Sequence, residues 1–407
     1  CAYGGYHEFT AAVSGAVLAV FLLIFLKADH YRRITDTYLL FSGILAVFYL
    51  ISVFYATDSG MAWTGVIKKG PVLFFALALA TMQTERRRQL LELLPELAAG
   101  ITVLAAAGAC IPVLNPYIIM ADRFAGTFGY ANTYAFVLLL ALVVLLERKN
   151  NRRIVYSGIL AAILILGMWF SGSRYTWVLA AGSMIFYGIR KRKNAKWAVR
   201  IVVIFALATA GAGIFLRNVE AVGRFFTTNL SSLYGRLLYW QDSLTLIKGH
   251  PFGMGYLGYF YEQTQVQTGV YTVRYVHNDW MQWILDIGWI PALILLVLLV
   301  RAICNRRRTF MERMLVALVL IHGCMEFDLE HNAVFFLLIL ILSCTEESLP
   351  VFWKKDGGWI ELEKEEAEKN SVWIRCGMAL CVFVWLYLSI PLSLYALGDV
   401  QQAAVWY

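Results

Sequence analysis

Residues 130–153 read YANTYAFVLLLALVVLLERKNNRR, an almost unbroken apolar run that ends in a cluster of basic residues. The apolar part, 130–146, approaches the length of about 20 residues that a helix needs to cross the hydrocarbon core of a bilayer. Basic residues directly after such a run are typical of the cytoplasmic end of a membrane helix. This stretch therefore predicts a membrane-spanning helix that ends inside the cell.

The same pattern recurs along the chain. Of its 407 residues, 60% are hydrophobic and 15% are charged, and the mean hydropathy is +0.64. This composition excludes an ordinary soluble, disordered or fibrous protein, because soluble domains carry about 25% charged residues. We expect residues 1–407 to form a single all-α domain, a polytopic integral membrane protein with about 12 transmembrane helices. The apolar runs that predict these helices are 9–26, 38–55, 65–83, 90–114, 130–146, 154–170, 175–189, 198–216, 280–300, 310–325, 332–345 and 376–398.

Basic connectors follow every second apolar run and so distinguish the two sides of the membrane. All but nine of the 35 lysines and arginines lie on one side, which predicts that this side is cytoplasmic, so the net charge of +8 requires no nucleic-acid partner. The connector 346–375 is expected on the same side. An even number of crossings places both chain ends outside, and Cys1 at the first position favours a missing upstream helix over a lipid-modified cysteine.

A long extracytoplasmic loop, residues 217–278, is the main non-spanning segment on the other side. Its many tyrosines, tryptophans and phenylalanines argue against disorder and predict a folded cap that carries interfacial helices. Residues 234–251, YGRLLYWQDSLTLIKGHP, place apolar residues such as Leu237 and Leu244 at helical spacing, as in an amphipathic helix at the membrane surface. The glycine-rich sequence 250–260, HPFGMGYLGYF, favours either a tight turn or the close approach of a ligand.

Nine basic residues lie on the outer side against the general tendency, so each needs a reason to be there. The simplest reason is a side chain that anchors its helix at the lipid boundary. Arginines from several segments would also suit a diphosphate, because the planar guanidinium binds phosphate oxygens in pairs. Arg123 at the mouth of a span, Arg174 at a hairpin tip and Arg236 in the cap are placed for this second role. The nine residues are Lys68, Lys69, Arg123, Arg174, Arg217, Arg224, Arg236, Lys248 and Arg274.

His277 lies where the outer cap re-enters the membrane, in RYVHNDWMQWILDIGW. An imidazole titrates near neutral pH and is therefore the natural general base at such a position, although a purely structural hydrogen bond is also open. Asn278 and Asp279 could orient the ring or cap the helix that follows, and capping is the role we favour for Asp279.

A second group of polar residues lies on the outer side in IHGCMEFDLEHNA, 321–333, between two predicted helices. Such a group could hold a metal ion, or it could close the turn between the helices through hydrogen bonds. We favour the hydrogen-bonded turn and predict no metal site. The residues are His322, Glu326, Asp328, Glu330 and His331.

Five short motifs occur in one order and all fall on the predicted outer side. They are an Arg before Gly-Thr-Phe-Gly-x-x-Asn (Arg123 to Asn132), Ser-Arg at a hairpin tip (Arg174), Tyr-Gly-Arg-x-x-x-Trp (Arg236), Pro-Phe-Gly-x-Gly (251–255) and His-Asn (His277, Asn278). Together they resemble the O-antigen ligase and polymerase family over roughly residues 40 to 345. Each motif alone is weakly specific, and their order and shared placement carry the resemblance.

The resemblance implies a metal-independent glycosyltransferase without a cofactor. Its donor would be a glycan on undecaprenyl, or another polyprenyl, diphosphate, and its acceptor a hydroxyl group of a glycan, glycolipid or protein on the outer face of the cytoplasmic membrane. By carry-over, Arg174 and Arg236 would hold the diphosphate and His277 would deprotonate the acceptor. A single displacement would invert the anomeric centre. Arg123, Asn132 and Asn278 match the motifs and complete the predicted substrate-binding residues.

Two further functions remain open at this point. A polymerase that joins repeat units would use the same donor chemistry, and the sequence does not separate it from a ligase. A transporter or flippase for a lipid-linked glycan is the alternative from another class. Transporters commonly contain internal repeats and ionisable residues near the middle of the membrane, whereas here the unusual charges gather at one face.

Overall fold

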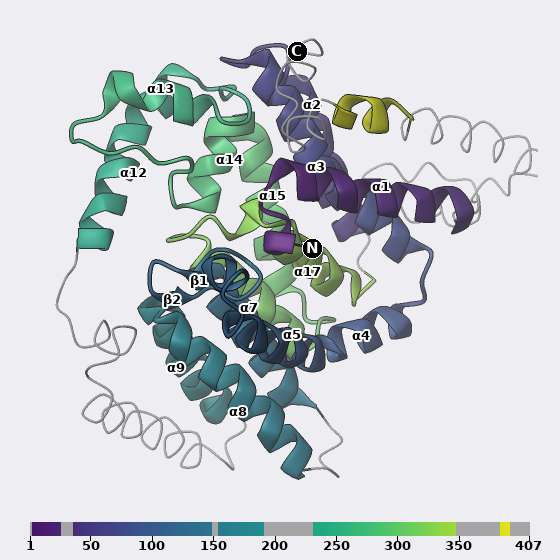
Figure 1. The fold of residues 1–407 in the computed structure, drawn as a ribbon. Coiled ribbons are helices and arrows are strands. Elements are labelled where there is room, and N and C mark those ends of the chain that lie inside the picture. The colour runs from purple at the N-terminus through teal and green to yellow at the C-terminus, as the bar shows by residue number, and fades with distance from the viewer. Residues whose placement is uncertain (1, 26–35, 149–153, 191–230, 347–382, 391–407) are drawn as a thin grey trace, which may run out of the picture.

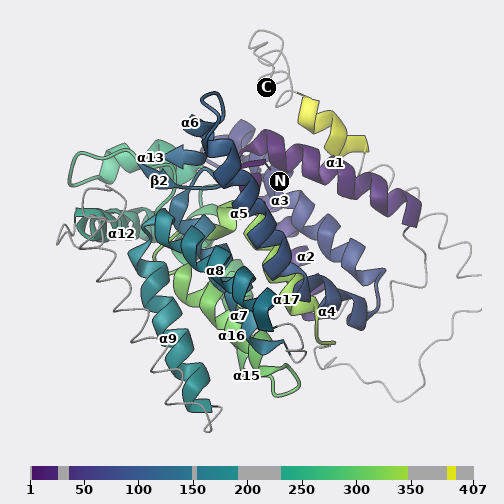
Figure 2. The ribbon, with the colours of Figure 1, turned by 60° about the horizontal axis from the view of Figure 1, so that its bottom comes forward.

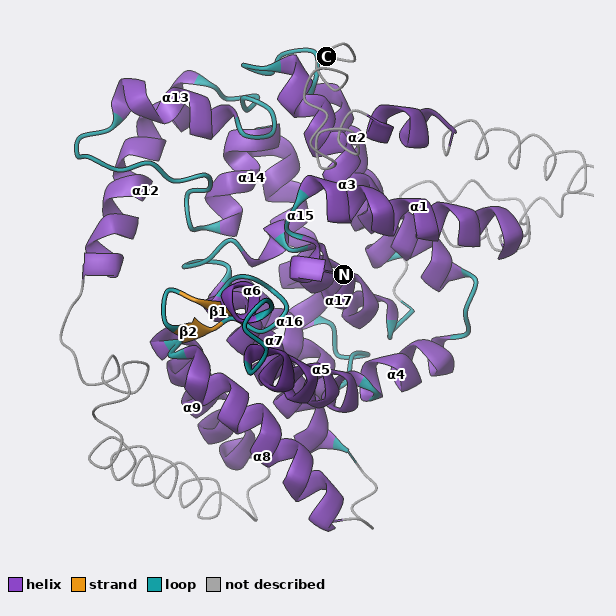
Figure 3. Ribbon diagram, in the orientation of Figure 1, coloured by secondary structure: helices purple, strands orange, loops and turns teal. Residues whose placement is uncertain are grey.

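The computed structural model describes residues 2–25, 36–148, 154–190, 231–346 and 383–390, which are mainly helical (Figures 1 and 3). The span expected at 198–216 lies outside the described residues, as do Arg217, Arg224 and most of the run 376–398. The same holds for the expected connector 346–375, apart from its first residue.

Helices make up nearly all of the secondary structure of the described residues. The strands β1 (Ile119–Met120) and β2 (Arg123–Phe124) pair antiparallel, with Ile119 opposite Phe124. The helices are η1 (Ala2–Gly5), α1 (Glu8–Phe25), α2 (Thr37–Ser52), α3 (Ser59–Ala80), α4 (Thr84–Glu92), α5 (Leu94–Ala109), α6 (Asn115–Ile118), α7 (Ala131–Glu147), α8 (Ile154–Ser171), α9 (Arg174–Arg190), α12 (Ser231–Gly249), α13 (Gly258–Val266), α14 (Asp279–Ile287), α15 (Trp289–Cys304), α16 (Phe310–His322), η4 (Asp328–Glu330) and α17 (Asn332–Ser343).

Several of these helices have the length and composition of membrane spans. Within the described residues, three stretches are long and apolar enough to cross a bilayer, namely Glu8–Phe25, Ser59–Ala80 and Thr84–Ala109. Shorter apolar helices include α2, α7, α15 and α17. The chain is therefore mostly helical with the features of a membrane protein, as expected, whereas the number of twelve spans stays a prediction.

Two of the expected helices differ from the structure in a way that affects the site. The run expected at 65–83 begins earlier, at Ser59 in α3, so Lys68 and Lys69 lie near the middle of a helix. The run expected at 280–300 is divided into α14 and α15 at Gly288, whose φ of 88° interrupts the helix. Apolar periodicity continues across this break, which is why the sequence predicts a single helix.

The glycine-rich sequence 250–260 packs against the break between α14 and α15. The backbone N–H of Met254 donates to the carbonyl oxygen of Leu285 at 2.6 Å. A Cβ atom on Gly253 would lie 2.7 Å from the carbonyl oxygen of Asp286, so no side chain fits there. The backbone N–H of Gly253 also donates to the carbonyl oxygen of His250 at 3.0 Å, so the tight turn expected from the sequence is present, and the glycines in addition allow two backbone segments to approach closely.

Helix α7 lies in the interior of the bundle and leads into the site. It packs against α5, α8, α9 and α16, and residues on all sides of it, such as the successive Leu139, Leu140 and Ala141, are fully buried (Figure 2). Its first turn carries Asn132 and Thr133 and faces the connection between α16 and α17. A rigid, buried helix thus positions the polar residues at its N-terminal end.

Helices α12 and α13 pack against α14 at one edge of the molecule (Figure 1). The helix predicted within 234–251 corresponds to α12, which ends at Gly249. Leu237 and Leu244 are exposed on α12, whereas Arg236 is buried. Two apolar residues of this helix are therefore exposed, whereas its arginine points into the protein.

Candidate functional site

The connection between α16 and α17 carries a fully buried carboxylate at Glu326. Its Oε1 accepts hydrogen bonds from Arg236 Nη2 at 2.5 Å and Asn132 Nδ2 at 2.7 Å. Its Oε2 accepts a hydrogen bond from the Tyr130 hydroxyl at 2.7 Å. These donors come from α12 and from the start of α7, so Glu326 joins three segments that lie far apart in the sequence. We call these four residues, with Arg123 and His277, the Glu326 network.

Arg123 extends the network from strand β2. Its Nη2 donates to Asn132 Oδ1 at 2.5 Å, and its Nε donates to the carbonyl oxygen of Ser171 at 2.7 Å. Asn132 therefore uses its amide nitrogen for Glu326 and its amide oxygen for Arg123, which fixes its orientation from both ends. Two of the predicted arginines, Arg123 and Arg236, are thus part of one hydrogen-bonded chain.

His277 lies beside the same carboxylate. Its Nδ1 is 3.7 Å from Glu326 Oε2, which is too far for a hydrogen bond but close enough for an ion pair when the ring is protonated. The ring packs edge-on against Phe327, with the centroids 4.8 Å apart. About 20% of the His277 side chain is exposed, whereas the Glu326 side chain is fully buried. The imidazole is therefore the part of this pair that a substrate could reach.

The charges around Glu326 keep it ionised. Burial alone would raise the pKa of this carboxyl group, but the neighbouring His277 and Arg236 lower the pKa to about 2. The carboxylate is therefore negative at neutral pH. A fixed negative charge in this place can orient a guanidinium and stabilise an imidazolium.

The backbone around His277 is strained and firmly held. Its φ of 55° lies in the left-handed region, which residues other than glycine rarely adopt and which often marks functional positions. Asn278 is the N-cap of α14, because its Oδ1 accepts from two backbone N–H groups of the first turn at 3.0 and 3.1 Å. The expectation that Asp279 caps this helix is therefore wrong. The Nδ2 of Asn278 donates to the carbonyl oxygen of Cys324 at 3.0 Å, which ties the His277 segment to the Glu326 segment.

Arg174 occupies the predicted hairpin tip, as the first residue of α9. Its side chain is exposed, and it is not among the described residues that bond to Glu326. The next residue, Tyr175, donates from its hydroxyl to the carbonyl oxygen of Ile321 at 2.5 Å. Arg174 thus lies at the end of α9 that contacts the end of α16, outside the Glu326 network.

Asp328 shows how the polar turn between α16 and α17 is built. Its Oδ1 accepts a hydrogen bond from the Thr133 hydroxyl at 2.7 Å, and its Oδ2 bonds to Nδ1 of His322. The acidic residues of the turn therefore have separate partners, as in the hydrogen-bonded turn that the sequence predicts. Across the described ranges, no group of three or more histidine, cysteine, aspartate or glutamate residues is arranged to hold a metal ion.

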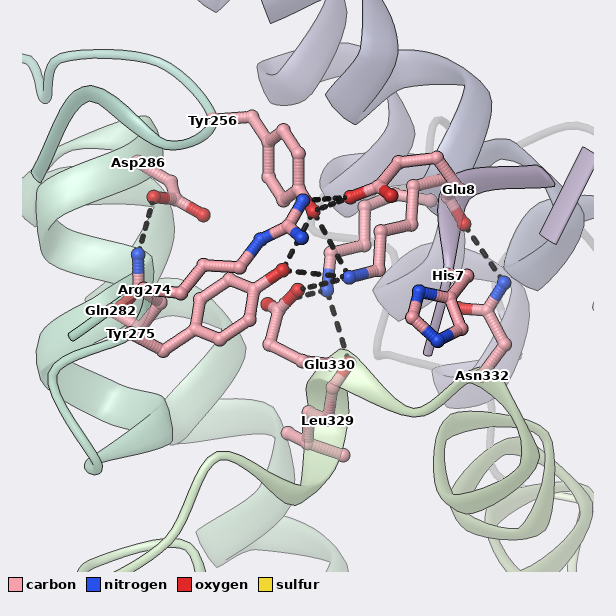
Figure 4. A network of polar contacts seen from close by, with 12 residues as sticks. His7, Glu8, Tyr256, Arg274, Tyr275, Gln282, Asp286, Leu329, Glu330 and Asn332 are labelled. Atoms are coloured by element: carbon pink, nitrogen blue, oxygen red, sulfur yellow. Dashed lines mark hydrogen bonds and ion pairs between the residues drawn. The ribbon is translucent and has the colours of Figure 1, made fainter. Parts of the chain in front are cut away.

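Glu330 ends the turn in a second buried network, shown in Figure 4. Its carboxylate pairs with Lys69 Nζ at 2.7 Å and Lys68 Nζ at 3.0 Å, and both lysine side chains are fully buried. Lys68 also donates to the hydroxyls of Tyr256 and Tyr275 at 3.0 and 2.9 Å. The simplest role that the sequence suggests for Lys68 and Lys69 is that of lipid anchors at the outer face. Their burial excludes this role. They bind the middle of α3 to the turn, and we call this set the Glu330 network.

Arg274 belongs to this second network. Its guanidinium pairs with Glu8 at the start of α1, and the Tyr256 hydroxyl also donates to Glu8 at 2.7 Å (Figure 4). The pair links α1 to the segment that precedes His277. Arg274 thus has a carboxylate partner of its own, which gives this arginine a structural role other than that of a lipid anchor.

Glu326 and Tyr130 are the residues of the first network that the sequence does not single out. In the sequence, Glu326 is one of five polar residues in an outer turn, and nothing relates it to Arg236, 90 positions away. Charge balance is the signal that could have found it, since an arginine near the lipid boundary requires a nearby acceptor. Tyr130 occupies an unspecified position within the motif that ends at Asn132, so the sequence gives no separate signal for it.

A comparison with protein families identifies part of the chain. Residues 159–297 match the family model described as O-antigen ligase. This segment contains Arg174, Arg236 and His277, whereas Arg123 and Glu326 lie outside it. A search of curated proteins finds no match. Over residues 159–297 the chain is therefore similar to the O-antigen ligase family, in agreement with the resemblance of its motifs.

Proposed function

We propose that this protein is a membrane glycosyltransferase that moves a glycan from polyprenyl diphosphate to an acceptor hydroxyl on the outer face of the cytoplasmic membrane. The family match supports the general class, an O-antigen ligase or polymerase type of enzyme. The observation that carries the finer proposal is the convergence of Arg123, Asn132, Arg236 and His277 around the carboxylate of Glu326. Guanidinium groups beside a partly exposed imidazole suit an anionic leaving group and a hydroxyl acceptor.

The arginines would bind the donor diphosphate. A guanidinium has five N–H donors, so Arg236 can bond to Glu326 and still bind two phosphate oxygens. Its bond to a buried carboxylate fixes the direction of the remaining donors. In this proposal, the exposed Arg174 adds a second guanidinium from the end of α9, and Arg123 holds Asn132 in place behind the phosphate.

The proposed transfer is a single displacement. The acceptor oxygen forms a bond to the anomeric carbon of the glycan while the bond from that carbon to the diphosphate oxygen breaks. The electron pair of the broken bond stays with the diphosphate, and the arginines stabilise this charge. The hydroxyl proton moves to His277, whose imidazolium is stabilised by the ionised Glu326 at 3.7 Å. The displacement inverts the anomeric centre and is independent of metal because guanidinium groups supply the positive charge.

The test uses the full-length protein in proteoliposomes that contain a polyprenyl-diphosphate-linked glycan and an acceptor. His277→Ala should lower the rate of glycosidic bond formation by about 10²- to 10⁴-fold, because the general base is lost. His250→Ala is the matched control, since His250 lies in the same outer segment but is exposed and outside the Glu326 network.

Two outcomes would contradict this proposal. A His277→Ala variant that transfers glycan at the wild-type rate would remove His277 from the reaction. Movement of the lipid-linked glycan across the bilayer without a new glycosidic bond would favour a transporter. The nature of the product separates ligation to a different acceptor from polymerisation, in which the acceptor is a second lipid-linked glycan.

A further inference from the structure

An apolar groove of about 540 Å³ lies between α9 and α16. The two helices pack against each other (Figure 2), and the groove follows one face of each. Apart from one serine and two arginines, the lining side chains are apolar or glycine. Representative lining residues are Val178, Gly182 and Phe186 on α9 and Met314, Ala317 and Ile321 on α16.

The length of the groove matches one lipid chain in one leaflet. On α16 the lining runs from Phe310 to Ile321, which at 1.5 Å per residue corresponds to roughly 16 Å. The hydrocarbon core of a bilayer is about 30 Å thick, so a single leaflet accounts for about 15 Å of it. An apolar groove of this length is therefore suited to one acyl chain.

Two arginines mark one end of the groove. Arg190, the last residue of α9, stacks on the ring of Phe310 at 4.7 Å, and Arg313 lies one turn into α16. Nε of Arg313 is buried without a hydrogen-bond partner. Among the described residues, neither guanidinium pairs with a carboxylate. Both arginines therefore line the same groove, and no carboxylate of the described residues pairs with either of them.

We infer that this groove binds an acidic phospholipid, with an acyl chain along α9 and α16 and the phosphate between Arg190 and Arg313. In the sequence, Arg190 begins the run RKRK and Arg313 closely follows RRR at 306–308, so this end lies on the side expected to face the cytoplasm. Acidic lipids attract basic groups at that surface. A lipid without net charge would leave the two guanidinium charges unbalanced.

The prenyl donor is not the occupant that we assign to the groove. Its diphosphate belongs, in the function proposed above, at the opposite ends of these helices. There α9 begins with Arg174 and α16 ends at His322, close to Glu326. A donor lipid with its phosphates at Arg190 would have its glycan at the wrong face. The lipid site and the proposed transferase activity are therefore independent, and each can fail without the other.

The first experiment measures lipid retention by native mass spectrometry of the full-length protein purified in detergent. We expect phosphatidylglycerol to be retained at least tenfold better than phosphatidylcholine. Arg190→Gln combined with Arg313→Gln should abolish this preference. Arg306→Gln combined with Arg307→Gln is the matched control, because these arginines are exposed on the neighbouring connector and do not line the groove. The control should keep the preference.

The second experiment blocks the groove and leaves its charges intact. Among the described residues, no atom lies within 4 Å of a Cβ built on Gly182, so Gly182→Leu places its side chain in the groove without displacing its neighbours. Gly158→Leu on α8 is the matched control, since its Cβ position is equally open and lies outside the groove. We expect Gly182→Leu to lose phosphatidylglycerol and Gly158→Leu to retain it.

Several results would overturn the inference. Equal retention of the two phospholipids by the wild-type protein would remove the acidic preference. Unchanged retention in Gly182→Leu would show that the acyl chain does not follow the groove. Better retention of polyprenyl phosphate than of phosphatidylglycerol would assign the groove to the donor instead. Displacement of phosphatidylglycerol by inorganic phosphate alone would show that only the anionic group is recognised.

Discussion

Glu326 and Glu330 lie four residues apart in one connection, and both are buried carboxylates paired with basic side chains. Their partners differ in exposure. Lys68 and Lys69, which bind Glu330, have no exposed side-chain surface. The partners of Glu326 reach the surface, because Arg236 is 11% exposed and His277 is 20% exposed. The ion pairs between Glu330 and the two lysines are closed within the bundle, whereas the pairs of Glu326 are open at its edge.

This difference teaches that burial of an acidic residue does not by itself indicate its role. The pairs between Glu330 and its two buried lysines involve protein groups alone, so they stabilise the contact between α3 and the turn. An open network such as that of Glu326 leaves N–H donors and an imidazole within reach of a ligand. The exposure of the basic partners therefore distinguishes a structural ion pair from a candidate site. The predictions below test this distinction.

The largest effect is expected for Glu330→Ala, and it should act on stability. The substitution leaves two lysines buried without their counter-charge, which typically costs about 3–5 kcal/mol. Thermal unfolding of the purified protein in detergent should show a large drop in melting temperature. Glu85→Ala, which removes an exposed glutamate from α4, is the control and should change little. Similar melting of the two variants would contradict a structural role for the Glu330 network.

Glu326→Gln should instead act on catalysis. The amide keeps the size of the side chain but removes the charge that orients Arg236 and stabilises protonated His277. Hydrogen bonds to charged groups are worth about 1.5–3 kcal/mol. The upper value of this range corresponds to a fall in the transfer rate of about 100-fold, which is the largest loss that we expect. Melting in detergent should change less than for Glu330→Ala. A wild-type transfer rate would show that the carboxylate is not part of the site.

Arg236→Lys should give the smallest of these effects, a loss of about tenfold in transfer. The ammonium group keeps the charge but cannot bind Glu326 and two phosphate oxygens in the planar geometry of a guanidinium. The loss should appear mainly as a higher KM for the lipid-linked donor in a steady-state assay. Lys248→Arg, an exposed exchange at the end of the same helix, serves as control. An unchanged KM would mean that Arg236 contributes only long-range attraction.

Much of the fold follows from local features of the sequence. The apolar runs predict helices such as α1, α2 and α7 because helix formation in a membrane depends on the residues of the helix itself. The break at Gly288 could not be predicted in the same way. It depends on the packing of residues 250–260 against α14, a contact between distant segments.

The site shows the same limit. The sequence motifs single out four candidate residues, because each is predicted at a helix end on the outer side or in the cap. They are His277, Arg236, Arg123 and Asn132. The role of Glu326 could not be derived, since its hydrogen-bond partners are 90 and more residues away in sequence.

Lys68 makes the two networks dependent on each other. It bonds to Tyr275, two residues before His277, and to Glu330, four residues after Glu326. The ring of Phe327 fills the space between Tyr275 and His277, with centroid separations of 5.4 and 4.8 Å. A single amine inside the bundle therefore ties the segment of His277 to the segment of Glu326, so that a change at Lys68 should act on both networks.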